Sequence, residues 1–220
     1  MTLKSIELET APNPTAAIIV LHGLGADGND FVPIAQELDL DAVGPVRYVF
    51  PHSPHRPVTV NGGAVMPAWY DIKGFGLVDN EDEAGLRDSQ AQIAALIDAQ
   101  VARGIPPGRI VLMGFSQGCA MTLMTGLRHP ARLAGLVCLS GYLPLASKLA
   151  AERNAANADV PIFMAHGRMD PVVQIGRGTT TRDVLATLGY QVEWHEYPMQ
   201  HSVHPQEIVD LNRWLLARLG

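Results

Sequence analysis

The pentapeptide Gly114-Phe115-Ser116-Gln117-Gly118 constrains this chain more than any other stretch, because it has the pattern Gly-x-Ser-x-Gly. In that pattern a serine lies on a sharp turn between a strand and a helix, where the flanking glycines relieve crowding against the neighbouring backbone. Residues 109–113 have the composition of a buried strand, and residues 117–129 indicate a helix that ends before Pro130. This context favours a nucleophilic Ser116 over the alternative, a purely structural turn.

Apolar strands alternate with helical segments along the rest of the chain. Strands are expected at residues 3–9, 17–21, 46–50, 109–113, 133–140, 161–165 and 192–197, and helices at 31–38, 82–101, 117–129, 148–154, 180–188 and 205–219. We expect Asn29 or Asp30 to cap the first helix, and residues 58–61 to form a hairpin with 69–72. The alternation predicts one α/β domain over residues 1–220, a mostly parallel central sheet with helices on both faces and the first strand at its edge.

Composition narrows the functional classes. A net charge of -6 without a basic run argues against nucleic acid as a partner and against an electrostatic membrane anchor. No apolar stretch reaches the length of a membrane span, so we expect a cytoplasmic protein. Cys119 and Cys138 are expected to be buried thiols, with a disulfide as the alternative. The histidines and cysteines lack zinc-like spacing, so neither metal nor cofactor is expected.

A serine nucleophile needs an acid and a base, and in hydrolases with this turn both follow the serine on loops that leave later strands. Asp170 follows the strand at 161–165 directly, whereas Asp159 precedes that strand and Asp183 falls within a helix. The position therefore favours Asp170 as the acid.

Eight histidines compete for the role of base. Only His201 and His204 lie on the loop after the last strand, and His204 adjoins Pro205, where it is expected to form the entrance to the terminal helix. We therefore predict His201 as the base that activates Ser116.

The developing negative charge on the substrate carbonyl oxygen needs two backbone N–H donors. One is expected from Gln117, at the start of the helix after Ser116. The other is expected from Leu24, in the glycine-rich loop 22–28 that leaves the first central strand. A phosphate-binding loop is the alternative for that stretch, but neither the dinucleotide spacing nor a P-loop lysine is present.

Apolar side chains without a helical or strand period occupy residues 62–79. Two interpretations remain open: an ordinary loop pinned to the core by Trp69 and Tyr70, or an apolar wall over the active site, to which Phe75, Leu77 and Val78 would contribute as substrate-binding residues.

Together these motifs resemble the carboxylesterase and acyl-protein thioesterase family of small α/β-hydrolases, also called the phospholipase/carboxylesterase family. The motifs occur in the family's order: Leu21-His22-Gly23-Leu24-Gly25, Phe50-Pro51-His52, Ala68-Trp69-Tyr70-Asp71-Ile72, the pentapeptide around Ser116, His166-Gly167-Arg168-Met169-Asp170 and His201. The resemblance covers nearly the whole chain. It implies a Ser116, Asp170, His201 triad, an oxyanion hole from Leu24 and Gln117, and an apolar acyl groove near Phe75 and Leu77.

Two departures from the family bear on the substrate. Members that cleave lipid-modified proteins often carry Trp where Phe31 stands, and Asp-Thr where this chain has Ala26-Asp27. The resemblance therefore implies a bacterial-type, cofactor-free serine carboxylesterase for short- to medium-chain esters, with an acyl-protein thioesterase or lysophospholipase as the alternative. A catalytically silent binding protein on the same scaffold is the rival from another class. The expected partner is a small ester or thioester, and the sequence is compatible with a homodimer.

Overall fold

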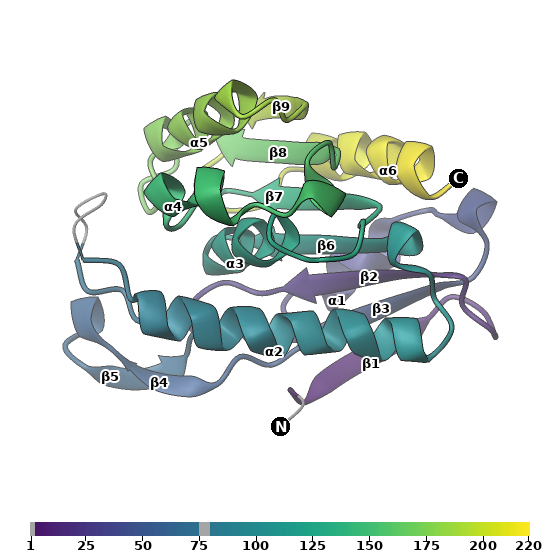
Figure 1. Cartoon of the computed structure of the whole chain (residues 1–220), viewed down its shortest axis with the longest axis horizontal. Coiled ribbons are helices and arrows are strands. Elements are labelled where there is room, and N and C mark those ends of the chain that lie inside the picture. Colours follow the sequence, from purple (N-terminus) through teal and green to yellow (C-terminus); the bar gives the residue numbers. More distant parts are fainter. Residues whose placement is uncertain (1–2, 75–79) are drawn as a thin grey trace.

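The computed structural model describes residues 3–74 and 80–220, and within them a seven-stranded sheet runs through the middle of the molecule (Figure 1). The spatial order is β1-β3-β2-β6-β7-β8-β9, in which β1 pairs antiparallel with β3 and every other pairing is parallel. The strands of this sheet are β1 (Ser5–Glu9), β2 (Ala16–Leu21), β3 (Val46–Pro51), β6 (Ile110–Phe115), β7 (Gly135–Leu139), β8 (Ile162–Gly167) and β9 (Val192–Tyr197). The mostly parallel α/β fold with β1 at an edge is confirmed.

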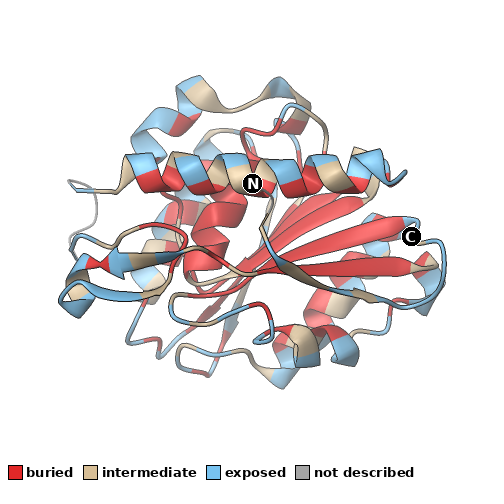
Figure 2. Cartoon of the chain, turned by 90° about the horizontal axis from the view of Figure 1, so that it is seen from below, coloured by how far each residue is buried: buried red, intermediate tan, exposed pale blue. Residues whose placement is uncertain are grey.

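Helices cover both faces of the sheet, as predicted. They are α1 (Val32–Glu37), α2 (Glu83–Ala102), α3 (Gln117–Gly126), α4 (Ala146–Glu152), α5 (Ile175–Thr187) and α6 (Pro205–Leu219). Alternate residues of β2 enter two separate apolar cores: Ile19 packs in the core under α2 and α3, and Ile18 in the core under α1 and α6. Figure 2 shows the result, with buried central strands between helices whose outer faces are exposed.

Two local predictions were wrong. Residues 58–61 do not pair with 69–72 as a hairpin. Instead β4 (His55–Val58) pairs antiparallel with β5 (Ala64–Pro67), because Gly62 and Gly63 adopt left-handed φ angles of 67° and 79° and turn the chain back early. Helix α1 begins after Phe31 with no side-chain cap, and the Asp27 carboxylate instead accepts hydrogen bonds from Asn29.

Helix limits also differ from the expected ones. Helix α3 ends at Gly126 rather than at residue 129, and α5 begins at Ile175 rather than at residue 180. Cys119 and Cys138 are both buried free thiols. Among the described residues, no helix combines the length and the apolar character that a membrane crossing requires.

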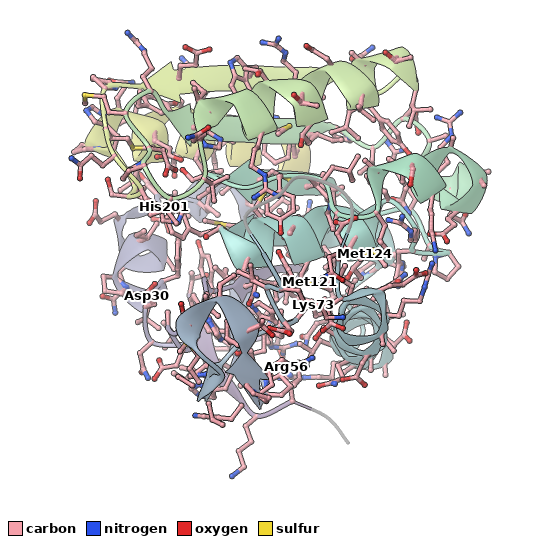
Figure 3. The ribbon with its side chains drawn as sticks, turned by 90° about the vertical axis from the view of Figure 1, so that its left-hand side faces the viewer. Asp30, Arg56, Lys73, Met121, Met124 and His201 are labelled. Atoms are coloured by element: carbon pink, nitrogen blue, oxygen red, sulfur yellow. The ribbon has the colours of Figure 1, made fainter. Side chains whose placement is uncertain are left out.

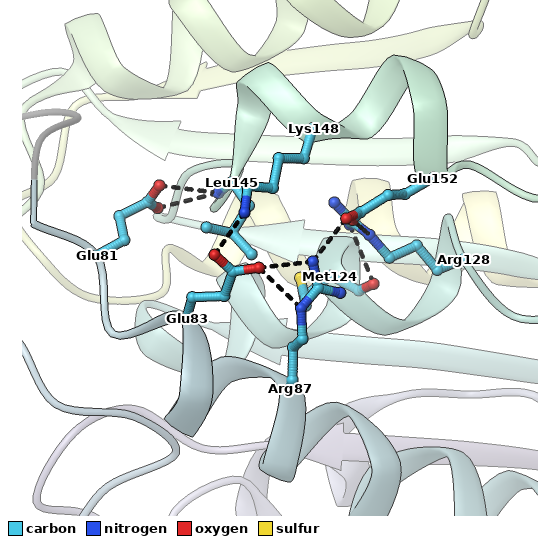
Figure 4. A network of polar contacts seen from close by, with 8 residues as sticks. All are labelled: Glu81, Glu83, Arg87, Met124, Arg128, Leu145, Lys148 and Glu152. Carbon is cyan, nitrogen blue, oxygen red and sulfur yellow. Dashed lines mark hydrogen bonds and ion pairs between the residues drawn. The ribbon is translucent and has the colours of Figure 1, made fainter.

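A network of ion pairs fastens α4 to the start of α2 (Figure 4). Glu83 pairs with Lys148 of α4 at 2.5 Å and with Arg87 one turn along α2 at 2.8 Å. Glu152 of α4 bridges Arg87 at 2.6 Å and the buried Arg128 at 2.8 Å. The network fixes α4 next to the segment that leads into α2.

A buried carboxyl group lies at the start of α6. His204 caps this helix by accepting a hydrogen bond from Gln206 N, which confirms its predicted position at the helix entrance. Glu207 completes the capping box by accepting from His204 N at 3.1 Å, and its Oε1 has no hydrogen-bond partner among the described residues. Burial raises the pKa of Glu207 to about 7.

Stability should therefore fall as pH rises through the range from about 4.5 to about 7. In that window the unfolded chain ionises Glu207 while the folded chain keeps the proton, which costs roughly 3 kcal/mol by pH 8. Glu207→Gln cannot ionise, so its unfolding free energy relative to wild type should increase by about that amount between pH 5 and pH 8. Urea unfolding at both pH values measures the change, with the exposed Glu37→Gln as control. An equal difference at both pH values would contradict a protonated Glu207.

Candidate active site

Ser116 lies on the turn between β6 and α3, in a backbone conformation that side chains rarely adopt, with φ 55° and ψ -116°. Its N–H donates to Leu139 O at 2.9 Å, which fastens the turn to the neighbouring strand. A Cβ atom at Gly114 would lie 2.2 Å from Gly118 O, and one at Gly118 would lie 2.0 Å from Leu21 O. Only glycine fits at these two positions, so close backbone contacts on both sides of the serine require both glycines of the pentapeptide.

Asp170 and His201 meet through a direct hydrogen bond. His201 Nδ1 donates to Asp170 Oδ2 at 2.6 Å, and Asp170 Oδ1 accepts from Val172 N at 2.8 Å and Val173 N at 2.9 Å. The Asp170 side chain is fully buried, whereas His201 is partly exposed. Because a carboxylate only accepts hydrogen bonds, the imidazole carries its proton on Nδ1, and Nε2 is left as an acceptor.

His201 is positioned beside the serine turn by an aromatic contact. The Phe115 ring, one residue before Ser116, packs against the His201 ring with 4.7 Å between centroids. Figure 3 views the end of the molecule where the parallel strands finish, and shows His201 there, on the loop between β9 and α6. Within the described residues no hydrogen bond joins Ser116 Oγ to the imidazole. Such bonds are often long before substrate binds.

A cleft of about 400 Å³ opens at the serine and includes Ser116, Leu24 and Gln117 in its lining. Gln117 is the first residue of α3, so its N–H belongs to the helix donors that have no partner within the helix. Leu24 N–H makes no hydrogen bond with the described residues, and Gly23 brings this loop against Ser116, since a Cβ there would lie 3.4 Å from Ser116 Cβ. Both predicted donors therefore border the same cleft as the serine.

The Gln117 side chain, whose role was not predicted from the sequence, hydrogen-bonds to the backbone of the loop that carries Trp69 and Tyr70. Its Oε1 accepts from Trp69 N at 2.8 Å, and its Nε2 donates to Tyr70 O at 2.7 Å. The Ser89 hydroxyl donates to Trp69 O, and the Trp69 indole donates to His22 O at 2.9 Å. Trp69 and Tyr70 are buried, so this part of the loop is pinned to the core, as one of the two interpretations expected.

Two buried histidines support the site without being available as bases. His22 donates from Nδ1 to Gly23 O at 2.7 Å and accepts from Ser53 N at Nε2, and burial lowers its pKa. His166 contacts Val173 O at 2.7 Å through Nε2, and burial lowers its pKa as well. Both remain neutral at pH 7 and hold, respectively, the Leu24 loop and the Asp170 loop.

The predicted acyl wall of Phe75, Leu77 and Val78 lies outside the described residues. The described lining of the cleft includes two cationic side chains, Lys73 and Arg177. Lys73 pairs with Asp82 at 3.5 Å. Tyr142 lines the cleft as well. None of these residues stood out in the sequence, because their place in the site depends on packing between distant segments.

The chain is similar to known proteins over most of its length. A model of the phospholipase/carboxylesterase family matches residues 4–218. The chain is similar to acyl-protein thioesterase 1 of Yarrowia lipolytica, with 39% identity over 206 residues that cover 91% of each chain. It is similar to acyl-protein thioesterase 1 of Neurospora crassa, with 42% identity over 214 residues that cover 93% of this chain and 87% of the relative. The crystal structure of Arabidopsis thaliana SOBER1 matches with a TM-score of 0.87 and 30% identity, covering 93% of this chain and 99% of that one.

Proposed function

Because the chain belongs to the phospholipase/carboxylesterase family of α/β-hydrolases, and is therefore a hydrolase of esters or thioesters, we propose that Ser116, Asp170 and His201 carry out the hydrolysis. The observation that carries the proposal is the hydrogen bond of 2.6 Å between His201 Nδ1 and the buried Asp170, made beside the serine turn. This bond fixes the imidazole tautomer that has a free acceptor at Nε2. That tautomer is the one a serine hydroxyl needs in a base.

In the proposed reaction, His201 Nε2 takes the proton from Ser116 Oγ as the oxygen attacks the carbonyl carbon of the substrate. The negative charge on the carbonyl oxygen is met by the N–H groups of Leu24 and Gln117. His201 then gives the proton to the leaving alcohol or thiol, and an acyl-enzyme remains on Ser116. Water attacks the acyl-enzyme after giving a proton to the same imidazole, and Ser116 recovers its proton as the acid leaves.

For the substrate we propose carboxylic esters and thioesters with short to medium acyl chains. The names of the relatives give specific support to a second candidate, an acyl-protein thioesterase, because they carry that name at 37–42% identity. Phe31 and the Ala26-Asp27 pair, which differ from the usual residues of depalmitoylating members, support the simpler esterase. The triad chemistry is the same in both cases, since the acyl-enzyme does not retain the leaving group.

Matched substrates separate these candidates. We expect an oxygen ester and a thioester with the same acyl chain both to be turned over, and both to be blocked by a fluorophosphonate that labels Ser116. A peptide acylated on cysteine tests the second candidate: it would be favoured if kcat/KM for the peptide exceeded that for a small thioester of equal chain length. Absence of both label and turnover would instead indicate the binding protein.

A further inference from the structure

A second cavity adjoins the cleft beside Ser116. This cavity of about 410 Å³ lies between α4, α5 and the segment after β7, with Leu143, Ala146 and Val184 among its apolar lining residues. The two cavities share three residues of their described lining: Glu81, Tyr142 and Arg177. These three residues lie where the cleft and the second cavity adjoin, and we call them the partition.

The middle of the partition is a stacked pair. The Arg177 guanidinium lies over the Tyr142 ring, with 3.6 Å from Cζ to the ring centroid. The Tyr142 hydroxyl makes a hydrogen bond of 2.8 Å with the Tyr70 hydroxyl, and the Tyr70 carbonyl accepts a hydrogen bond from Gln117 Nε2. A continuous series of contacts thus runs from the serine turn to Arg177 and fixes the ring on which the guanidinium lies.

The backbone on either side of the stack is held as well. Leu143 N donates to Thr181 Oγ1 at 2.9 Å, and the same hydroxyl donates to Arg177 O at 2.9 Å, so α5 is fastened to the segment that carries Tyr142. Glu81 accepts from Leu145 N at both carboxylate oxygens, at 3.0 and 3.1 Å (Figure 4). The partition is built into the fold at three points.

Stacking holds the Arg177 side chain in this position. Its Nε is buried and has no hydrogen-bond partner among the described residues. The Glu81 carboxylate is near enough to feel the charge of Arg177, but its hydrogen bonds go to Leu145. A side chain with little hydrogen bonding beyond the stack contributes chiefly by filling space, since an arginine covers apolar surface with its methylene stem.

The proposed reaction directs the acyl part of the substrate into the cleft. The leaving group must lie next to His201, which gives it a proton, and His201 does not contribute to the described lining of the cleft. The acyl part therefore extends from Ser116 in the other direction, along the cleft toward Tyr142 and Arg177.

We propose that the Arg177 side chain, stacked on Tyr142, closes the far end of the acyl cleft and sets the longest acyl chain that the enzyme accepts. Removing the side chain would join the cleft to the second cavity, whose apolar lining would then cover additional methylene groups. This inference rests on the proposed hydrolysis at Ser116.

The test is kcat/KM for p-nitrophenyl esters with acyl chains of two to twelve carbons. For Arg177→Ala we expect the ratio of the ten-carbon to the two-carbon ester to rise at least tenfold over wild type, because each newly covered methylene contributes roughly fourfold. Arg177→Ser should behave in the same way. Arg177→Met, which keeps the bulk and loses the charge, should keep the wild-type ratio within about threefold.

Arg182→Ala is the matched control, because Arg182 lies on the same helix, over Trp194, and lines neither cavity. An unchanged chain-length profile in both Arg177→Ala and Arg177→Ser, with folding verified by thermal unfolding, would overturn the proposal. So would a shift in Arg177→Met as large as in Arg177→Ala, since charge rather than bulk would then be responsible. Failure of the proposed function is a different result, in which wild type itself turns over none of the esters.

Discussion

Replacing Ser116 with alanine is expected to lower kcat/KM for any ester substrate by at least about 10⁴, because no acyl-enzyme can form without the hydroxyl oxygen. The fold should survive the change. Ser116 is partly exposed, its backbone N–H bond to Leu139 O does not involve the side chain, and the strained φ of 55° is one that alanine tolerates about as badly as serine. Thermal unfolding within a few degrees of wild type would show that the loss is chemical.

A fluorophosphonate probe makes this prediction independent of substrate choice. Wild type should bind one probe covalently, and Ser116→Ala none. Ser202→Ala is a matched control, because Ser202 is exposed and lies on the loop next to His201. Labelling that persisted in Ser116→Ala, or that vanished in Ser202→Ala, would move the nucleophile to another residue.

Most of the fold was readable from local pattern. Buried parallel strands such as β2 and β6 are uninterrupted apolar runs, and their order with the intervening helices leaves few possible topologies. The errors fell where one tight turn decides the outcome. Gly62 and Gly63 close the β4–β5 hairpin within a few residues, whereas the sequence pattern alone was equally compatible with a wider loop.

The candidate site likewise has residues that the sequence predicts and contacts that it does not. Ser116, Asp170 and His201 were predicted from their order after successive strands, a rule that holds because parallel strands finish at one edge of the sheet. The Gln117 contact with Trp69 joins residues 48 apart, and the Tyr142–Arg177 stack joins residues 35 apart, so no local pattern marks either contact. The sequence favoured an esterase because of Phe31 and the Ala26-Asp27 pair, whereas the relatives carry the name of a thioesterase.

Asp170→Asn is expected to cost about 10⁴ in kcat, the scale of the loss when the acid of a serine protease is changed in this way. The replacement is nearly isosteric, and the amide oxygen can still accept from Val172 N and Val173 N, so the loop should keep its shape. In the variant the amide N–H₂ faces His201 Nδ1. In wild type the carboxylate oxygen at this position accepts a hydrogen bond from Nδ1 at 2.6 Å. The imidazole must turn its Nδ1 lone pair toward the amide and carry its proton on Nε2, where it cannot act as a base toward Ser116.

The two histidines on the loop between β9 and α6, His201 and His204, provide the decisive comparison. His201→Ala should lose activity as severely as Asp170→Asn, and the double variant should lose little more, because both changes remove the same base. His204→Ala should instead keep most activity and lose about 1 kcal/mol of stability, since His204 caps α6 through Gln206 N. Measuring kcat and urea unfolding for all four variants tests the assignment. An active His201→Ala beside an inactive His204→Ala would show that the base is His204, and that the Asp170–His201 hydrogen bond is structural.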